Sequence, residues 1–312
     1  MDSVVDKIKL GMIGISKGNG HPFSFASIIN GFNNEEMEKS GWDIIYNYLR
    51  ERDKSEFGFN KVKITHVWTQ DRAQSEKLAS ATKIQNIVEN IDDMIDKVDG
   101  VIIARDDYQN HFKMSKRFLE SNKFVFVDKP LSLNVKELLF FKKYLEEGKL
   151  MSCSGVRYAK ELDEIRANIN NFGVIKLIRG TVVNSLEKYG IHMLDGIFGV
   201  INFQVESVLC VQAKHTSLLL KNKDKSLIYI DALGKAPKTF QFDFWSQKKR
   251  FHAEITDNFS MFRRTVFHFI NMIRTKKPNI APSQVINIMK VLIAANVSQN
   301  ENRMVRLDEI NI

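Results

Sequence analysis

Cysteine is scarce in this sequence, which contains only Cys153 and Cys210 among its 312 residues. Two cysteines so far apart form neither a disulfide framework nor a zinc-ligand pattern, which indicates a reducing compartment and no metal site. Long apolar runs are also missing, and Asp6, Lys7 and Lys9 place charge within the first ten residues. The sequence therefore predicts a cytoplasmic protein with neither a signal peptide nor a membrane span.

Acidic residues are too few to balance the basic ones, because 46 Lys and Arg stand against 37 Asp and Glu and give a formal net charge of +9. Such a charge attracts anions, whether a dinucleotide, a phosphorylated sugar or a nucleic acid. The basic residues are scattered, however, and a diffusely solvated basic surface explains the charge better. No helix-turn-helix or stacking-aromatic pattern is present, so no nucleic-acid partner is predicted.

The chain is long enough for two domains, which we expect at residues 1–131 and 132–312. With 44% apolar and 27% charged residues, it is not a disordered chain. Apolar strands alternate with helices in its first part, which indicates βαβ units and a parallel sheet. The strands are predicted at residues 8–15, 62–68, 101–104 and 124–127.

The second part has a different pattern of elements. After a helix at about 134–147, strand-like runs follow with fewer helices between them, which predicts a mostly antiparallel second sheet. These runs are residues 151–158, 174–183, 205–213, 227–233 and 239–244. Two apolar helices are expected at about 259–274 and 283–297. The fold class is therefore α/β, with a C-terminal α+β domain on a large open sheet.

A glycine-containing loop follows the first strand, and a helix capped by Ser24 is predicted after it. A strand, a glycine loop and a helix N-terminus together form an anion-binding corner. The spacing is a poor match to the dinucleotide fingerprint G-x-G-x-x-G, and glycine-rich turns also occur for steric reasons alone. The candidate cofactor-binding residues of the loop are Gly14, Ser16, Gly18, Asn19 and Gly20.

Residues 31–59 interrupt the alternation of strands and helices. The segment is rich in charge and includes the aromatic residues Trp42, Tyr46 and Tyr48. We expect it to pack as a helix at the sheet edge or over the site.

Polar residues follow the second strand, at the position where dinucleotide-binding units recognise a ribose. Thr69 stands where an acid is usual, Asp71 could reach the ribose, and Arg72 could meet a 2′-phosphate. Asp71 could equally be a simple helix cap. NAD and NADP therefore both remain open as cofactors.

The stretch Phe124-Val-Phe-Val-Asp-Lys-Pro130 reads as a fully buried strand whose carboxyl end emerges at Asp128 and Lys129. Open α/β sheets bind ligands beyond these ends, so Lys129 is predicted to face the ligand. The alternative is a solvated turn before the next helix. Arg105 and Asp106 follow the neighbouring strand in the same way.

Several motifs, in order, resemble the glucose–fructose oxidoreductase and inositol dehydrogenase family, known as Gfo/Idh/MocA. A strand followed by a polar triplet and His111 resembles the family's loop on the nicotinamide side of the cofactor. Phe126-Val-Asp-Lys-Pro-Leu131 resembles its Glu-Lys-Pro motif, with Asp128 in place of glutamate. Tyr189-Gly-Ile-His-Met-Leu-Asp195 resembles the start of its substrate-domain helix, and residues 267–307 resemble its C-terminal end.

The resemblance implies an N-terminal Rossmann domain that binds NAD or NADP, and a C-terminal domain whose open sheet often mediates oligomerisation. It implies a homo-oligomer, a dimer or tetramer, acting on a sugar or nucleotide sugar. Lys129 would contact nicotinamide and the reacting oxygen, and His192 would exchange the proton. Further implied cofactor-binding residues are Arg105, Asp106, His111 and Asp128, and implied substrate-binding residues are Lys129, Arg157, Tyr158, Tyr189, His192 and Asp195.

The chemistry suits these residue types. A histidine with a pKa near neutrality can take up and return the hydroxyl proton, and a lysine cation stabilises a developing alkoxide. The family usually places an aspartate four residues before this histidine, whereas this chain has Lys188. Lys188 would lower the pKa of His192 or replace it as the base, and His192 could also be a structural helix-terminus residue. The alternative function is a catalytically inactive dinucleotide-binding sensor or regulator.

Overall fold

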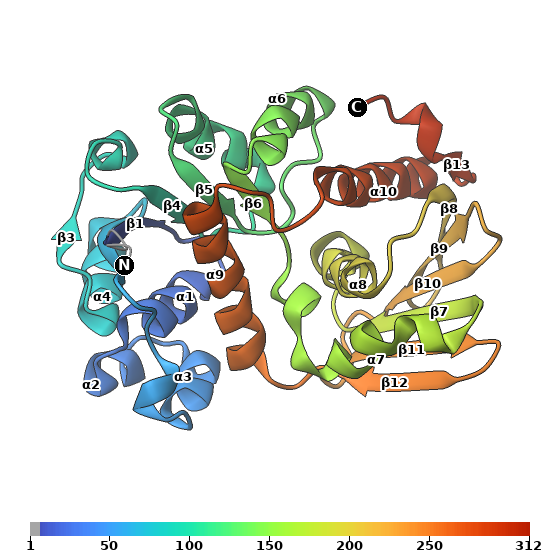
Figure 1. The fold of residues 1–312 in the computed structure, drawn as a ribbon, viewed down its shortest axis with the longest axis horizontal. Helices are drawn as coiled ribbons and strands as arrows, with labels where there is room; N and C mark the ends of the chain where they lie inside the picture. Colours follow the sequence, from blue (N-terminus) through green and yellow to red (C-terminus); the bar gives the residue numbers. More distant parts are fainter. Residues whose placement is uncertain (1–6) are drawn as a thin grey trace, which may run out of the picture. The chain divides into compact units, whose positions relative to one another are not determined.

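A computed structural model describes residues 7–312, so Asp6 of the charged N-terminus lies outside the described residues. The described chain forms two compact units, each made of several segments (Figure 1). The first unit contains residues up to Ser132, Phe141–Ser152 and Phe262–Asn279. The second contains Leu133–Phe140, Cys153–Met261 and Ile280–Ile312. The domain boundary between residues 131 and 132 stays a prediction.

The first unit is built on a six-stranded parallel sheet in the order β3-β2-β1-β4-β5-β6. Strand β1 lies at its centre, and the chain winds outward from it in both directions, which is a doubly wound order. This confirms the predicted parallel sheet and the Rossmann domain that the resemblance implied. Strands β4 and β5 are buried along their whole length, as expected when helices cover both faces. The strands are β1 Ile8–Ile13, β2 Val62–Trp68, β3 Asn86–Ile87, β4 Gly100–Ile103, β5 Phe124–Val127 and β6 Leu150–Ser152.

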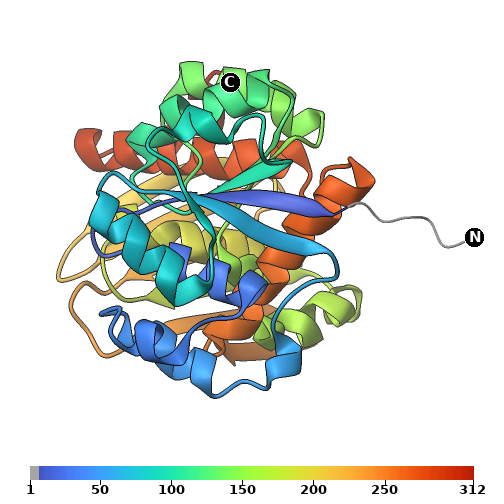
Figure 2. The same cartoon turned by 90° about the vertical axis from the view of Figure 1, so that its left-hand side faces the viewer.

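Helices cover both faces of this sheet (Figure 2), with α1 and α4 (blue and cyan) on one side and α5 (green) on the other. On the α1 side, the ring of Phe126 in β5 lies 5.8 Å from that of Phe25 in α1 and 5.8 Å from that of Phe269 in α9. Burying these large rings supplies much of the driving force for the layer. The helices are α1 His21–Asn30, α2 Asn34–Glu38, α3 Asp43–Arg50, α4 Arg72–Thr82, α5 His111–Glu120, α6 Val135–Glu146 and α9 Asn258–Thr275.

Two predictions about the first unit were wrong. Ser24 is not a helix cap, because α1 already begins at His21 after Gly20, with Pro22 in its first turn. Proline suits the first turn because its missing N–H needs no partner there. Ser24 instead accepts a hydrogen bond of 2.6 Å from the hydroxyl of Tyr48. The predicted single helix of residues 31–59 is two helices, α2 and α3.

The predicted strand 151–158 was also assigned to the wrong sheet. Its first residues form β6, which pairs in parallel with β5 at the edge of the first sheet. Its last residues form a short 3-10 turn, Gly155–Tyr158. The turn begins because the hydroxyl of Ser154 caps it by accepting a hydrogen bond of 3.2 Å from the Val156 backbone.

The second unit is built on a seven-stranded sheet in the order β12-β11-β7-β10-β9-β8-β13, and only β7 and β10 pair in parallel. This confirms the predicted mostly antiparallel open sheet. Strands β9, β12 and β13 were not predicted. The strands are β7 Ile175–Val182, β8 Val205–Gln212, β9 Thr216–Asn222, β10 Leu227–Ala232, β11 Phe240–Ser246, β12 Arg250–Glu254 and β13 Val305–Arg306.

Helices α8 (Leu186–Val200) and α10 (Pro282–Glu301) cover one face of the second sheet, and α7 spans Asp163–Asn168. The close approach of α8 depends on Gly180 in β7, where a Cβ would lie 3.1 Å from the Cβ of Met193. Helix α8 starts three residues before the predicted Tyr189, because Ser185 caps it. Lys188 and His192 therefore lie within one helix, four residues apart.

Candidate functional site

The loop between β1 and α1 depends on its glycines. A Cβ at Gly14 would lie 2.6 Å from Cγ of Pro22, and Gly18 has a φ of 81°, which other residues rarely adopt. A Cβ at Gly20 would lie 2.5 Å from the Trp42 ring, so the segment of residues 31–59 packs directly against the loop. The loop leads into the N-terminus of α1, where the Asn19 side chain accepts a hydrogen bond of 2.9 Å from the His21 backbone. The strand, the loop and the helix N-terminus adjoin as predicted, and anion binding at this corner stays a prediction.

Asp128 anchors this loop from the end of β5. Asp128 is 2% exposed. It accepts hydrogen bonds from Nδ2 of Asn19 at 3.1 Å and from the Lys129 backbone at 2.9 Å, and it lies 2.6 Å from Nδ1 of His21. Burial alone would raise the pKa of Asp128, but the His21 and Lys129 charges and these hydrogen bonds hold it well below its usual range. Asp128 is therefore a permanent anion that ties the loop to β5.

His21 was not predicted as a site residue. It follows the last glycine of the loop and is 107 residues from Asp128, so only the fold shows the pairing. Its ring also packs edge-on to Phe262, with centroids 4.9 Å apart. A signal for His21 existed in the sequence, since a histidine directly after a glycine loop stands at a helix N-terminus.

Lys129 lies beyond Asp128 and is 6% exposed. Its Nζ is 3.8 Å from Oδ2 of Asp106. Asp106 in turn accepts a hydrogen bond of 2.5 Å from the Ser16 hydroxyl, which itself accepts one from the Asp106 backbone at 3.2 Å. The fold thus gathers Ser16, Asn19, Asp106, Asp128 and Lys129 at the carboxyl edge of the first sheet. The solvated turn that was the alternative for Asp128 and Lys129 does not fit this burial.

Arg105 and His111 hold the backbone around this cluster. Arg105 donates to the Ile15 carbonyl and to the Gln70 side chain, each at 2.8 Å, and forms an ion pair with Asp107 at 2.6 Å. His111 is fully buried, and its two ring nitrogens lie 2.9 Å from the carbonyls of Pro130 and Arg105. Burial lowers the pKa of His111. Both side chains position the loops, and their contact with a cofactor stays a prediction.

The residues after β2 make local contacts. Asp71 caps α4 by accepting a hydrogen bond of 2.9 Å from the Ala73 backbone, as the alternative interpretation held. The Thr69 hydroxyl lies 2.9 Å from that of Ser75. Arg72 is exposed and pairs with Glu76 at 3.0 Å and with Glu89. The roles of these residues toward a ribose or a 2′-phosphate stay predictions.

A second buried aspartate organises the predicted residues of the second unit. Asp195, 3% exposed, accepts hydrogen bonds from the Ser154 backbone at 2.7 Å and from Arg157 at 3.1 Å. Burial raises the pKa of Asp195 and outweighs the opposing effect of the Arg157 charge. Arg157 also donates to the side chain of Gln284. Tyr158 is largely buried, which raises the pKa of its hydroxyl.

Ser154, which was not predicted, links this network to His192. Its hydroxyl lies 2.6 Å from Nδ1 of His192. The half-buried His192 ring also packs against Tyr189 and Phe240, with centroids 5.2 and 5.8 Å away. Lys188 is exposed one turn earlier on α8, and its backbone N–H is bound by the cap Ser185 at 3.4 Å. The fold therefore gathers Ser154, Arg157 and Asp195 with His192.

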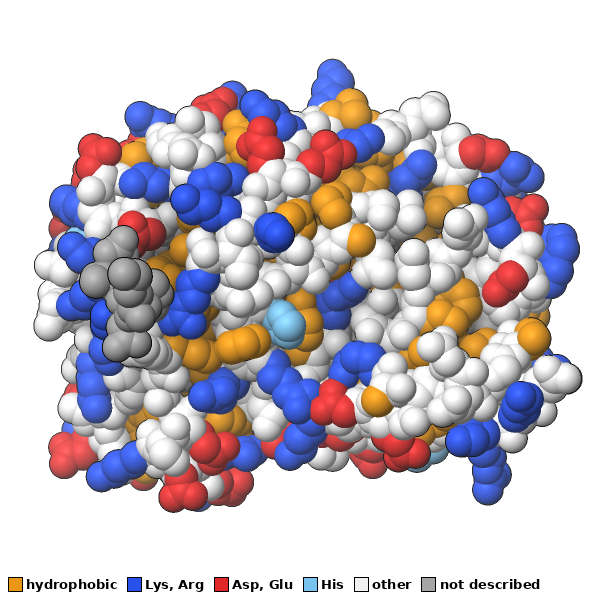
Figure 3. Space-filling model, viewed as in Figure 1, with side chains coloured by type: hydrophobic (Ala, Val, Ile, Leu, Met, Phe, Trp, Pro, Cys, Tyr) orange, Lys and Arg blue, Asp and Glu red, His pale blue; other side chains and the backbone are white. Residues whose placement is uncertain are grey.

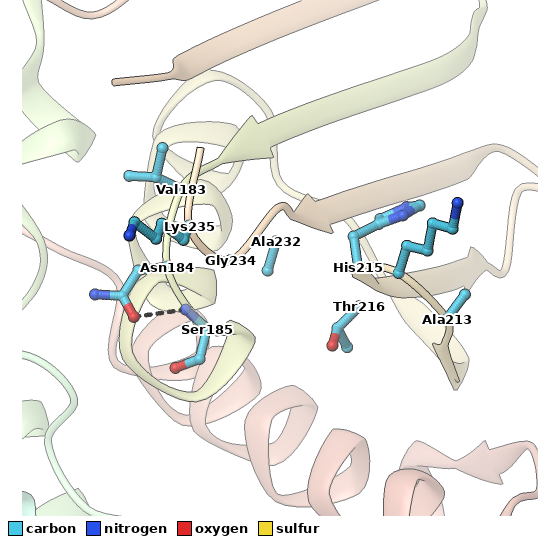
Figure 4. A pocket seen from close by; sticks show the side chains of 10 residues that line it. Val183, Asn184, Ser185, Ala213, His215, Thr216, Ala232, Gly234 and Lys235 are labelled. Atoms are coloured by element: carbon cyan, nitrogen blue, oxygen red, sulfur yellow. Dashed lines mark hydrogen bonds between the residues drawn. The ribbon is translucent and has the colours of Figure 1, made fainter. Parts of the chain in front are cut away.

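The second unit also contains a hollow of about 590 Å³ at the ends of β7 and β10, beside the cap of α8 (Figure 4). Of the described residues that line it, none was predicted to bind substrate. Three of them are basic or titratable: Lys214, His215 and Lys235. Elsewhere, Figure 3 shows Lys and Arg spread over the visible face among acidic residues, without one dominant cluster there.

Two kinds of feature are missing from the described residues. Among residues 7–312, no helix is long and apolar enough to cross a membrane. Within the same range, no group of three or more His, Cys, Asp or Glu side chains is arranged to hold a metal ion. Both cysteines are buried, and they are not joined in a disulfide.

Comparison with known protein families gave a match to the N-terminal half of the chain. The model of the family GFO_IDH_MocA, described as an oxidoreductase family with an NAD-binding Rossmann fold, matches residues 8–155. A search of curated proteins gave no match.

Solved structures resemble the whole chain. Scyllo-inositol dehydrogenase from Lactobacillus casei, solved with bound NAD(H) and scyllo-inositol, has a TM-score of 0.76 at 15% identity, over 97% of this chain and 100% of that one. Myo-inositol 2-dehydrogenase from Lactobacillus plantarum scores 0.76 at 15% identity, over 96% and 99%. A myo-inositol dehydrogenase from Corynebacterium glutamicum scores 0.74 at 13% identity, over 96% and 99%. At such identities the likeness shows the fold alone.

Proposed function

Because residues 8–155 of this chain belong to the Gfo/Idh/MocA family of NAD-binding oxidoreductases, we propose that the protein is an NAD(P)-dependent dehydrogenase or reductase. It transfers a hydride between nicotinamide and a hydroxyl or keto carbon of a sugar or nucleotide-sugar derivative. The observation that carries the proposal is the buried Lys129 beside the glycine loop at the carboxyl edge of the first sheet. This edge is where open α/β sheets bind their ligands.

The residues present fit a dinucleotide. A Cβ at Gly18 would meet nothing within 4 Å, so the loop leaves open space where a pyrophosphate can approach its backbone. The N-terminus of α1 adds a positive dipole end. Ser16 and Asn19 lie on the same loop, and their side chains hold it in place by binding Asp106 and Asp128. When bound, the nicotinamide supplies the acceptor or donor of the hydride.

Lys129 is assigned the electrostatic role. Its Nζ is held near Asp106 without a closer ion pair, since the two atoms are 3.8 Å apart. A lysine ammonium in such a buried place stabilises the negative charge that develops on the reacting oxygen. Asp128, bound to the backbone N–H of Lys129, orients the chain at this point.

We assign the proton transfer to His192. The hydroxyl of Ser154 supports this role through its contact with Nδ1 of the His192 ring. The Ser154 hydroxyl can donate to Nδ1 of a neutral ring or accept from Nδ1 of a protonated one. Both protonation states of His192 are therefore satisfied at Nδ1 while the other ring nitrogen exchanges a proton. Lys188 is less suited to act as the base, because its side chain is exposed on α8. Arg157, Tyr158, Tyr189 and Asp195 are proposed to shape the substrate side of this unit.

The protein is further proposed to be a cytoplasmic homo-oligomer that uses the face of the second sheet opposite α8 and α10. Side chains on this face alternate with those that pack on the helices, and Leu177, Leu219 and Tyr229 are only partly buried there. Trp245 on the same face is 38% exposed. An open face of this kind fits a dimer or tetramer contact.

A substrate panel tests the proposed function. Absorbance of the reduced cofactor at 340 nm is followed with inositols, sugars, sugar acids and nucleotide sugars, with each of NAD and NADP. We expect turnover with at least one sugar-like compound, at a rate that falls when Lys129 is replaced by Met. Cofactor binding without turnover on any class would favour the alternative of an inactive sensor.

A further inference from the structure

The segment of residues 31–59 builds most of a second hollow, which the proposed function leaves unused. Its volume is about 510 Å³. The rest of its lining comes from Asn30 at the end of α1, Lys63 at the start of β2 and Lys83 at the end of α4. Because β2 runs parallel to β1, this hollow lies at the amino edge of the first sheet, opposite the edge that carries Lys129.

The described lining of this basic hollow contains five cations and no carboxylate. The cations are Arg50, Arg52, Lys54, Lys63 and Lys83. Arg52 forms an ion pair with Glu56 at 3.8 Å, and the Arg50 guanidinium lies 5.3 Å from the Tyr46 ring. Five like charges around one hollow repel one another, so a bound anion is favoured there.

The fold places Lys83 and Asn30 at this hollow. Lys83 closes α4 in the left-handed conformation, and its Nζ lies 3.7 Å from where a Cβ at Gly31 would stand. Asn30 ties the floor of the hollow to β2 by accepting from the Ile64 backbone at 3.0 Å and donating to its carbonyl at 2.9 Å. This part of the hollow is therefore already in place before an anion binds.

Two aromatic rings add a second kind of contact. Phe32 and Phe57 both line the hollow, are half-buried, and have ring centroids 5.6 Å apart. A partly exposed ring beside arginines offers a planar ligand a stacking surface, which a bare phosphate does not need.

The positive surface continues beyond the hollow. A neighbouring hollow of about 270 Å³ shares Asn30, Lys63 and Lys83 and adds Lys7. None of the described residues that line it is acidic. The combined site has room and charge for more than one phosphate.

From this combination we propose that the basic hollow binds a nucleotide, with its phosphates on the Arg and Lys side chains and its base against Phe32 and Phe57. The ligand is distinct from the nicotinamide cofactor, which belongs to the opposite edge of the sheet. The site is independent of the proposed catalytic chemistry, since Lys129 and His192 do not line it.

Calorimetric titration of the full chain with GTP and with tripolyphosphate tests the proposal. The variant Arg50→Gln/Lys54→Gln/Lys83→Gln removes three cations of the hollow. The matched control Lys77→Gln/Lys113→Gln/Lys143→Gln removes three exposed lysines from α4, α5 and α6. We expect the first variant to weaken GTP binding about tenfold or more, and the control to change it less than about twofold. Thermal melts verify that both variants fold.

The aromatic contact is tested by Phe57→Leu, which keeps an apolar side chain at this place. It should weaken GTP binding by roughly five- to tenfold, the low end of the loss of one stacked base, and leave tripolyphosphate unaffected. Equal losses for both probes, or none, would show a phosphate site without base recognition. No GTP binding at millimolar concentration, or binding that the hollow variant leaves unchanged, would overturn the proposal.

Discussion

Asp128 in the first unit and Asp195 in the second are both buried, yet their surroundings move their pKa values in opposite directions. The Asp128 carboxylate contacts the ring of a histidine and accepts hydrogen bonds from a side-chain amide and a backbone N–H. Asp195 receives one backbone N–H and one guanidinium. In both cases burial raises the pKa, and only the fuller set of partners around Asp128 reverses the sign.

The difference matters for what each aspartate supports. Asp128 is a fixed anion that holds the glycine loop and the backbone of Lys129, so it serves cofactor binding and charge placement. Asp195 holds the backbone of Ser154, whose hydroxyl contacts His192, so it serves the orientation of a group that must change its protonation state. The same residue type thus supports an electrostatic role in one unit and a proton-transfer role in the other.

The largest expected effect separates the two candidate bases of the second unit. His192→Ala should lower turnover by roughly 100- to 10,000-fold, the usual contribution of a positioned acid–base group. Lys188→Asp is the comparison variant and should keep most of the activity, because Lys188 is exposed. Rates across pH 5 to 9 provide the measurement. Full activity in His192→Ala with none in Lys188→Asp would make the lysine the base.

Replacing the cation of the first unit should have the next largest effect. Lys129→Met should lower turnover by roughly 100- to 1000-fold, as for one preorganised electrostatic donor. Cofactor affinity should change little, because the loop is anchored through Asp128 and Asn19. Steady-state rates and cofactor titrations of the same protein separate these effects. Unchanged turnover would contradict the assigned role.

Neutralising the two aspartates sharpens the comparison directly. Asp128→Asn should lower the free energy of unfolding by about 1–3 kcal/mol, because the groups that now bind the Asp128 carboxylate would lose their charged acceptor. Asp195→Asn should cost less, since the raised pKa shows that its charge is poorly compensated. Urea unfolding at pH 7 compares the two variants. A greater loss for Asp195→Asn would reverse our ranking.

The same pair predicts opposite pH dependences. The folded pKa of Asp128 is lowered, so its contribution is fully present above the unfolded value near 3.9 and is lost as the pH falls toward its folded pKa. For Asp195 the folded pKa is raised, so stability from this group falls as the pH rises through the unfolded value toward the folded one. The free energy of unfolding is measured from pH 7 to pH 3 for each Asn variant and for the unchanged protein. The difference between variant and unchanged protein should change with pH in opposite directions for the two aspartates.

The smallest expected effect belongs to Ser154. Removing its hydroxyl in Ser154→Ala should lower kcat/KM by roughly three- to tenfold, the value of one hydrogen bond of about 1 kcal/mol. Because the hydroxyl contacts Nδ1 of His192, the pH profile should shift as well. A lower rate with an unchanged pH profile would point to a structural role only.

Much of the fold follows from local patterns. Apolar strands that end in polar residues predicted the carboxyl edge at Ser16, Arg105 and Asp128, and the parallel sheet brings these ends together. The strand at 151–158 was misassigned because a short apolar run does not indicate which sheet it joins. The Ser24 cap was wrong because the helix already begins at His21, with Pro22 in its first turn.

The site was only partly predictable for the same physical reason. Lys129 and His192 stand in recognisable motifs, whereas His21 and Ser154 act through partners 107 and 38 residues away. The basic hollow is assembled from α1, β2, α4 and the segment of residues 31–59, whose charges look scattered in the sequence. Contacts between residues far apart in the sequence depend on the topology of the fold. The periodic pattern of apolar residues along the chain does not specify that topology.

Cofactor titration tests the central claim most directly, because every assigned role rests on a dinucleotide at the loop from Gly14 to Gly20. Calorimetry with NAD and NADP in both redox states should show saturable binding of at least one form. Gly18→Val, which strains a residue with φ of 81°, should weaken that binding at least tenfold without unfolding the protein. No binding of any of the four forms at millimolar concentration would contradict the account.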